Sequence, residues 1–255
     1  MRLLVLATYS NSTKILYNYL KRDFNITHVV IEDKIKTRNF LSYRFKKMSF
    51  VVFVDQLIFM VFASRVLSFV YKSRVKSLIG ECNLDNSDIP NEVITKINSV
   101  NAKKVTDIIN RENPDYILVN GTRIISRNVL NSTSIKFINI HAGITPAYRG
   151  VHGAYWALVN REKNLAGVTV HYVNSGVDTG EIISQTTIAI DKSDCIITYP
   201  IKQLNEGLKL LSDFLKHKEI GGSFTPKLIE VNHSEQWFHP GFFQYLYHRI
   251  VYGIK

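Results

Sequence analysis

Two short stretches of the sequence contain three polar residues of the kinds that take part in general acid–base chemistry. Asn139 and His141 lie two residues apart in INIHAGITPAYRG (138–150), and Asp178 lies in VNSGVDTG (173–180). An amide donates hydrogen bonds, an imidazole with a pKa of about 6.5 exchanges protons near neutral pH, and a carboxylate stabilises the imidazolium. On its own, an Asn-x-His pair is also typical of a loop cap beside a packed histidine.

The elements around these residues alternate between strands and helices, which predicts an α/β, Rossmann-like fold with a mostly parallel sheet whose later strands pair antiparallel. Strands are expected at 2–8, 27–33, 92–100, 114–121, 134–140, 166–173 and 181–190, and helices at 10–24, 102–113, 151–160 and 194–218. Because strand residues two apart share a face, Asn139 and His141 should project together at the carboxyl end of their strand, where open α/β sheets bind ligands. We expect a catalytic domain over 1–200 and a C-terminal helix and tail over 201–255.

One segment, 38–79, interrupts this alternation and predicts a helical, basic and apolar insertion. Ten basic residues and one acid, Asp55, lie between Lys34 and Lys76, so this stretch carries +9 of the total +11 and the rest only +2. A local charge of this kind does not favour nucleic acid as a partner. The longest unbroken apolar runs, 50–54 and 57–63, are shorter than the roughly 18 residues of a spanning helix, so none is expected. Packing on the body, a homodimer contact and a peripheral contact with an anionic membrane all remain open.

The remaining features predict no metal site and a reducing compartment. Cys82 and Cys195 have neither disulfide nor metal spacing, and no acidic or cysteine partner gives His233 and His239 a metal geometry. The apolar start, Leu3–Ala7, favours a first strand over a signal peptide, which indicates a cytoplasmic protein. His171 is expected to be a packing residue.

Three blocks taken together, NGTRIIS (120–126), NIHAGITPAYRG (139–150) and VDTG (177–180), resemble the formyltransferases that use 10-formyltetrahydrofolate. That group includes the glycinamide ribonucleotide and methionyl-tRNA formyltransferases, and the resemblance covers 94–200 well and 1–35 weakly. It implies that Asn139 donates to an oxyanion and that His141 and Asp178 handle protons, without saying which is the formal base. The residues that it implies for folate binding are Asn120, Gly121, Thr122, Arg123, Ile124, Ile125, Val173 and Gly176.

The acceptor is the part of the resemblance that varies within the group. The stretch ATYSNSTKIL (7–16) lacks the glycine-rich phosphate loop of the purine enzymes, and the 37 residues after Lys218 are too few for a tRNA-binding domain. The sequence HAGITPAYRG looks most like the branch of the family that formylates nucleotide-linked amino sugars. These sugars are used for bacterial surface polysaccharide, such as the O-antigen of lipopolysaccharide, whose synthesis finishes at the inner membrane surface. Candidate acceptor-binding residues are Ser10, Asn11, Ser12, Arg149 and His152. A purine-type enzyme, a formyltetrahydrofolate hydrolase and a non-catalytic membrane adaptor are the alternatives.

Overall fold

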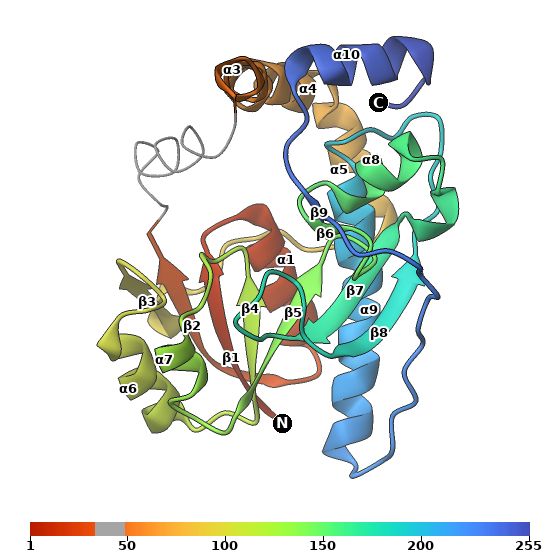
Figure 1. The fold of residues 1–255 in the computed structure, drawn as a ribbon. Helices are drawn as coiled ribbons and strands as arrows, with labels where there is room; N and C mark the ends of the chain where they lie inside the picture. Colours follow the sequence, from red (N-terminus) through yellow and green to blue (C-terminus); the bar gives the residue numbers. More distant parts are fainter. Residues whose placement is uncertain (34–48) are drawn as a thin grey trace.

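A seven-stranded sheet forms the centre of the computed structural model, which describes residues 1–33 and 49–255 (Figure 1). Its strands run in the order β3-β2-β1-β4-β5-β7-β8. Their bounds are β1 Arg2–Thr8, β2 Asn25–Glu32, β3 Ile94–Ile97, β4 Tyr116–Asn120, β5 Lys136–His141, β7 Gly167–Tyr172 and β8 Ile182–Thr187. The five neighbouring strands β3, β2, β1, β4 and β5 pair in parallel, whereas β7 pairs antiparallel with both β5 and β8. The predicted fold class, including the antiparallel later strands, is confirmed.

Helices cover both faces of this sheet, because β1 is apolar on both sides. Leu3 and Val5 pack in one core cluster with α1 (Asn11–Leu20) and α9 (Tyr199–Glu219). Leu4 and Leu6 point the other way and pack with α6 (Lys103–Glu112) and α7 (Arg127–Leu130). A strand buried on both faces reads as an unbroken apolar run instead of an alternating one, as LLVLA does. Helix α9 begins at Tyr199, five residues later than expected, with Pro200 in its first turn.

The described part of the predicted insertion is helical from Phe50 to Glu81, and 38–48 lie outside the described residues. It comprises α3 (Phe50–Ile58), a π-helical turn η1 (Phe59–Ala63), α4 (Ser64–Val70) and α5 (Lys72–Glu81). The stretch Phe50–Val70 is 21 residues long and apolar enough to cross a membrane by length and composition, and 17% of an 18-residue window within it is buried. The helix is longer than the two unbroken apolar runs, because Asp55 and Gln56 interrupt those runs without ending the helix.

The C-terminal region adds a helix and a short strand that the sequence reasoning did not predict. Strand β9 (Gln236–Trp237) pairs in parallel with β6 (Arg149–Gly150), and α10 (Phe242–Val251) follows it. Helix α10 and α8 (Gly153–Val159) share a third core cluster with the insertion, through Phe59, Tyr155 and Tyr245. Short 3₁₀ turns lie at Asn91–Val93 and Lys163–Leu165. The tail therefore ties the insertion to the loop that follows β5.

Candidate active site

Strand β5 carries Asn139 and His141 at its carboxyl end, as predicted from the two-residue period. Asn139 pairs in register with His171 of the antiparallel strand β7, and its Nδ2 lies 3.2 Å from the Nε2 of His171. His141 is buried, and its Nε2 lies 2.7 Å from the carbonyl oxygen of Tyr148. A carbonyl only accepts, so Nε2 of His141 carries the proton and Nδ1 turns to the other side.

Asp178 lies on that other side of His141. Its Oδ2 is 3.3 Å from Nδ1 of His141 and accepts the N–H of Gly150 at 3.0 Å. Its Oδ1 is 3.7 Å from Nε2 of His171. Asp178 has a φ of 51°, in the left-handed region that Asp and Asn tolerate better than most residues. The loop after β7 thus returns the carboxylate to β5, and the amide, imidazole and carboxylate converge in one place.

Burial and neighbouring charges set the protonation of this group. Burial lowers the pKa of His141 below its usual value, against the opposing effects of Asp178 and the Tyr148 carbonyl. For Asp178, burial alone would raise the pKa, but His171 and His141 in their protonated forms, together with the Gly150 N–H, bring it below its usual value. The carboxylate is therefore ionised at neutral pH, and the lowered pKa favours the neutral form of the neighbouring His141 imidazole.

His171 is buried, as expected of a packing residue, and also makes polar contacts. Its Nδ1 lies 2.8 Å from the carbonyl oxygen of Tyr172, which places the proton on Nδ1 and leaves Nε2 to accept from the Asn139 amide. An amide has two N–H groups, so this contact orients Asn139 and leaves its second N–H as a donor. The sequence signal was the Val-x-His-Tyr strand directly before the Asp178 loop, but only the β5–β7 register reveals the contact.

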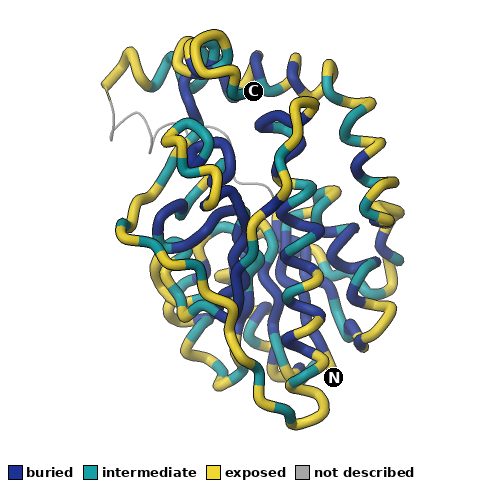
Figure 2. The backbone as a smooth tube through the Cα atoms, turned by 90° about the vertical axis from the view of Figure 1, so that its right-hand side faces the viewer, coloured by how far each residue is buried: buried dark blue, intermediate teal, exposed yellow. Residues whose placement is uncertain are grey.

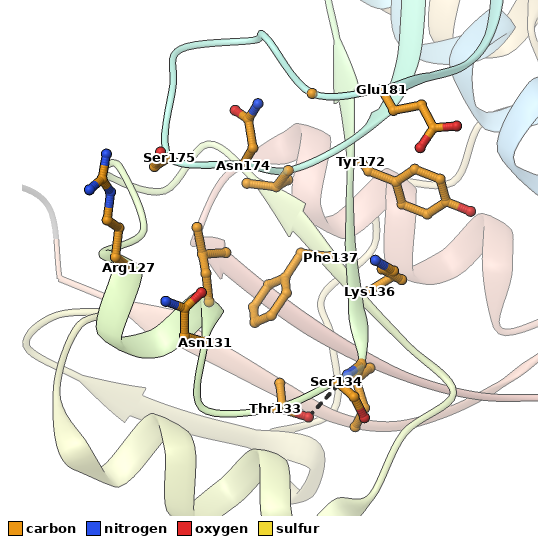
Figure 3. Close-up of a pocket in the computed structure, with 14 residues that line it drawn as sticks. Arg127, Asn131, Thr133, Ser134, Lys136, Phe137, Tyr172, Asn174, Ser175 and Glu181 are labelled. Atoms are coloured by element: carbon orange, nitrogen blue, oxygen red, sulfur yellow. Dashed lines mark hydrogen bonds between the residues drawn. The ribbon is translucent and has the colours of Figure 1, made fainter.

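The loop that carries Asp178 also lines a hollow of about 680 Å³ (Figure 3). The other side of the hollow is formed by α7 and the chain leading into β5, with Leu130, Ile135 and Phe137 as apolar surface. Arg127, Asn131, Asn174 and Glu181 add polar groups. This size and mixture are typical of small-molecule sites. Asn139, His141 and Asp178 do not line the hollow, but loop 173–181 and strand β5 connect it with them.

The predicted folate residues divide into two groups. Val173 lines the hollow, and Gly176 donates its N–H to Asn174 Oδ1 within the same loop. Residues 120–125 do not line it. Asn120 donates to the hydroxyls of Ser12 and Thr13.

The other residues of 120–125 make contacts within the protein or differ in exposure. The Arg123 side chain donates to buried Glu32 at 2.7 Å, so it braces β2. Ile125 is buried in the core beside α6, whereas Ile124 is exposed. Gly121 adopts a φ of +68°, and Thr122 donates its hydroxyl to the Arg123 carbonyl.

The predicted acceptor residues lie in two places. Ser10 caps α1 by accepting the Thr13 N–H, with Asn11 and Ser12 in the first turn. His152 lies at the N-terminus of α8 with a φ of 59°, and its Nε2 is 2.9 Å from Nδ1 of His239. Burial, and then the charge of His239, lowers the pKa of His152 to about 3. Arg149 reaches the carbonyl oxygen of Val177, which places it against the Asp178 loop.

No cluster of three metal-ligating side chains occurs within 1–33 and 49–255. The four histidines nearest the loop after β5 contact one another or carboxylate and carbonyl oxygens instead.

Comparison with known proteins identifies a family by sequence. A family model described as formyl transferase matches residues 1–215. The methionyl-tRNA formyltransferase of Clostridioides difficile is 31% identical over 139 residues, which are 54% of this chain and 44% of that protein. The one from Thermodesulfovibrio yellowstonii is 35% identical over 116 residues, 45% of this chain and 37% of that protein. The chain therefore spans less than half the length of these relatives.

Solved structures share the fold at low sequence identity. A sugar N-formyltransferase from Shewanella sp. aligns with a TM-score of 0.54 and 15% identity, covering 93% of this chain and 76% of that one. A phosphoribosylglycinamide formyltransferase from Anaplasma phagocytophilum aligns with a TM-score of 0.55 and 16% identity, covering 87% of this chain and 88% of that one. A 4-N formyltransferase from Francisella tularensis aligns with a TM-score of 0.55 and 15% identity, covering 92% of this chain and 75% of that one. With the match over 1–215, the chain belongs to the formyl transferase family.

Proposed function

We propose that this protein transfers the formyl group of 10-formyltetrahydrofolate to the amine of a nucleotide-linked amino sugar. The observation that carries the proposal is the convergence of Asn139, His141 and Asp178, with Oδ2 of Asp178 3.3 Å from Nδ1 of His141. These residues come from strand β5 and the loop after β7, 37 positions apart in the sequence. A purely structural arrangement has no need to bury an ionised carboxylate between two imidazoles.

In the proposed reaction, the amine nitrogen forms a bond to the formyl carbon and the bond from that carbon to the folate nitrogen breaks. The second N–H of Asn139 donates to the oxyanion that develops on the formyl oxygen. The His141–Asp178 pair takes the proton that the amine loses and returns it to the departing folate nitrogen. One proton moves from amine to leaving group, so the pair ends the cycle in the state in which it began.

The hollow beside loop 173–181 is the proposed place of the folate. Its apolar surface from Leu130, Phe137 and Val173 suits a flat ring, and its amide and charged groups suit the ring's polar edge. We propose that residues 120–125 and Gly176 support this pocket indirectly, because their hydrogen bonds fix the two loops beside it. Residues 1–200 form the catalytic domain in the same proposal.

The acceptor is proposed to bind on the other side of Asp178. The N-terminus of α1, with Ser10, Asn11 and Ser12, offers N–H and hydroxyl donors of the kind that bind a diphosphate. Arg149 and His152 would meet the sugar, because both lie within two residues of Gly150, which donates to Asp178. Sugar N-formyltransferases are among the proteins that share this fold. We propose a cytoplasmic enzyme of surface polysaccharide synthesis that works at the inner membrane surface.

The test is a panel of nucleotide-linked amino sugars with 10-formyltetrahydrofolate, followed by the absorbance of released tetrahydrofolate. Glycinamide ribonucleotide and charged initiator tRNA serve as competing acceptors, and formate release without any amine would indicate a hydrolase. We expect Asn139→Ala to lower kcat by roughly 10²–10³, the usual effect of losing one oxyanion donor. Exposed Asn164→Ala is the matched control. A less than threefold loss in Asn139→Ala would remove this amide from the mechanism.

A further inference from the structure

Large apolar side chains are exposed on two helices at one end of the molecule. Of the nineteen exposed large hydrophobic residues among those described, eight lie on Phe50–Val70 and five on α10 and the residue after it. Figures 1 and 2 place α3, α4 and α10 across the same end, beyond the carboxyl ends of β1 and β5. We call the exposed side of these helices the apolar platform. The residues that define it best are Val51, Phe62, Phe69, Phe243, Tyr247 and Ile250.

The two helices of the apolar platform are joined to each other and to the body. Oδ1 of Asp55 on α3 accepts the N–H of Phe243 at the start of α10, at 3.0 Å. On the inner side, Phe59 is buried against Tyr245, with ring centroids 5.4 Å apart. Ala63 and Leu67 are buried in the same cluster. The platform is therefore a composite surface from two distant parts of the sequence.

These inner contacts decide how the long helix can meet a membrane. A helix that crossed the bilayer would expose Asp55 to lipid and would remove Phe59 and Leu67 from the protein core. In the plane of the interface, the same helix keeps its inner side on the protein and presents its outer side to the acyl chains. Helices with one apolar face and flanking basic groups bind membranes in this way.

The charges around the platform suit an anionic surface. Arg65, Lys72 and Lys76 are exposed along α4 and α5, while the one acid between 50 and 76, Asp55, is used by α10. The stretch 238–255 contains Arg249 and Lys255 and no Asp or Glu. A second copy of this chain would bring the same positive charge to the surface and be repelled, whereas anionic headgroups would be attracted.

We infer that the apolar platform docks on a bilayer with anionic headgroups, with the helix Phe50–Val70 and α10 lying side-on in the interface. The ring of Phe59 is 6.3 Å from that of His152, which lies two residues after Gly150, so the bilayer lies on the His152 side of the catalytic group. This inference deepens the proposed membrane contact and is independent of whether formyl transfer occurs.

The test is co-sedimentation of the full chain with vesicles of phosphatidylcholine alone or with one quarter phosphatidylglycerol. We expect binding to the mixed vesicles, reduced at least tenfold by Phe69→Glu and by Ile250→Glu. Both side chains are about four-fifths exposed, at 81% and 79%, so neither change should disturb folding. The matched control is Ile220→Glu, 81% exposed at the end of α9 and outside the platform. Changing Lys72 or Lys76 to Gln should weaken binding about fivefold each at low salt, from roughly 1 kcal/mol per basic residue.

Two results would overturn the inference. One is equal sedimentation of wild type, Phe69→Glu and Ile250→Glu. The other is a wild-type dimer in solution that fails to bind vesicles and that Ile250→Glu converts to a monomer, which would make the platform an interface between copies. Turnover of soluble acceptors by Ile250→Glu, measured without vesicles, reports on the catalytic group separately. Loss of vesicle binding with retained turnover, or the reverse, distinguishes failure of one proposal from failure of the other.

Discussion

Replacing Asp178 by Asn tests the catalytic group most directly, because the change removes a charge and little else. Asn also tolerates the φ of 51° at this position, and its amide oxygen can still accept the Gly150 N–H. Asp178 Oδ2 is 3.3 Å from His141 Nδ1. Once His141 holds the proton taken from the amine, its charge and that of Asp178 attract by about 5 kcal/mol at this separation and an effective dielectric constant of about 20. We therefore expect kcat to fall by roughly 10³–10⁴.

The assay is tetrahydrofolate release over a range of pH, with folate binding measured by calorimetry. Folate affinity should change less than about threefold, because Asp178 does not line the hollow. Burial already lowers the pKa of His141 and Asp178 opposes that shift, so losing the carboxylate lowers this pKa further. The acidic limb of kcat/KM should move to lower pH while the plateau falls. A plateau within tenfold of wild type, or an acidic limb moved to higher pH, would refute the assigned roles.

Two other predictions concern neighbouring histidines. His171→Ala leaves the Asn139 amide without its acceptor, which costs about 1–3 kcal/mol. We therefore expect kcat to fall roughly 5- to 150-fold, with KM for folate unchanged. Steady-state kinetics that match wild type would leave His171 a packing residue. The pKa of His152 is lowered to about 3 in the folded protein, so the unfolded chain binds the extra proton and His152 costs stability as pH falls from 6.5 to about 3. Urea unfolding of His152→Asn should show a weaker loss of stability on acidification than wild type, and parallel curves would contradict this.

The shared position of Asn139 and His141 was predictable because it follows from local rules. The two-residue period of a strand places Asn139 and His141 on one side, and the strand order of an α/β sheet places them at its carboxyl edge. Asp178 required the family resemblance, since its approach to His141 depends on a loop that turns back over β5. His171 could not be placed from the sequence, because its contact depends on the antiparallel register of β5 and β7.

The C-terminal region was harder to predict because its structure comes from partners far away in the sequence. Strand β9 is two residues long and forms only against Arg149–Gly150. Helix α10 has an apolar side without acidic residues in its first turn, and Gly241 before it has no side chain to cap it. Its stabilising contacts come from the insertion, through Phe59 and Asp55, and from α8, through Tyr155. Neither partner is recognisable from the tail alone.

Asp55 therefore has a structural role that its place in an apolar run does not indicate, and Asp55→Ala tests this role. The carboxylate accepts the N–H of Phe243 in the first turn of α10, where a helix has unsatisfied donors and a partial positive charge. Losing such a cap costs about 1–2 kcal/mol. The amides of α10 should therefore exchange with deuterium roughly 5- to 30-fold faster.

Asp55→Asn is the matched control for this helix, because it keeps an acceptor oxygen and loses only the charge. Exchange in Asp55→Asn should lie between those of wild type and Asp55→Ala, while β1 and β4 exchange as in wild type in both variants. Unchanged protection of α10 in Asp55→Ala would mean that its other contacts hold the helix, among them the packing of Tyr245 on Phe59 and the Tyr155–His248 hydrogen bond. In that case the acid within the long apolar helix would lack a structural reason, and the argument for its side-on position at the membrane would rest on the burial of Phe59 and Leu67 alone.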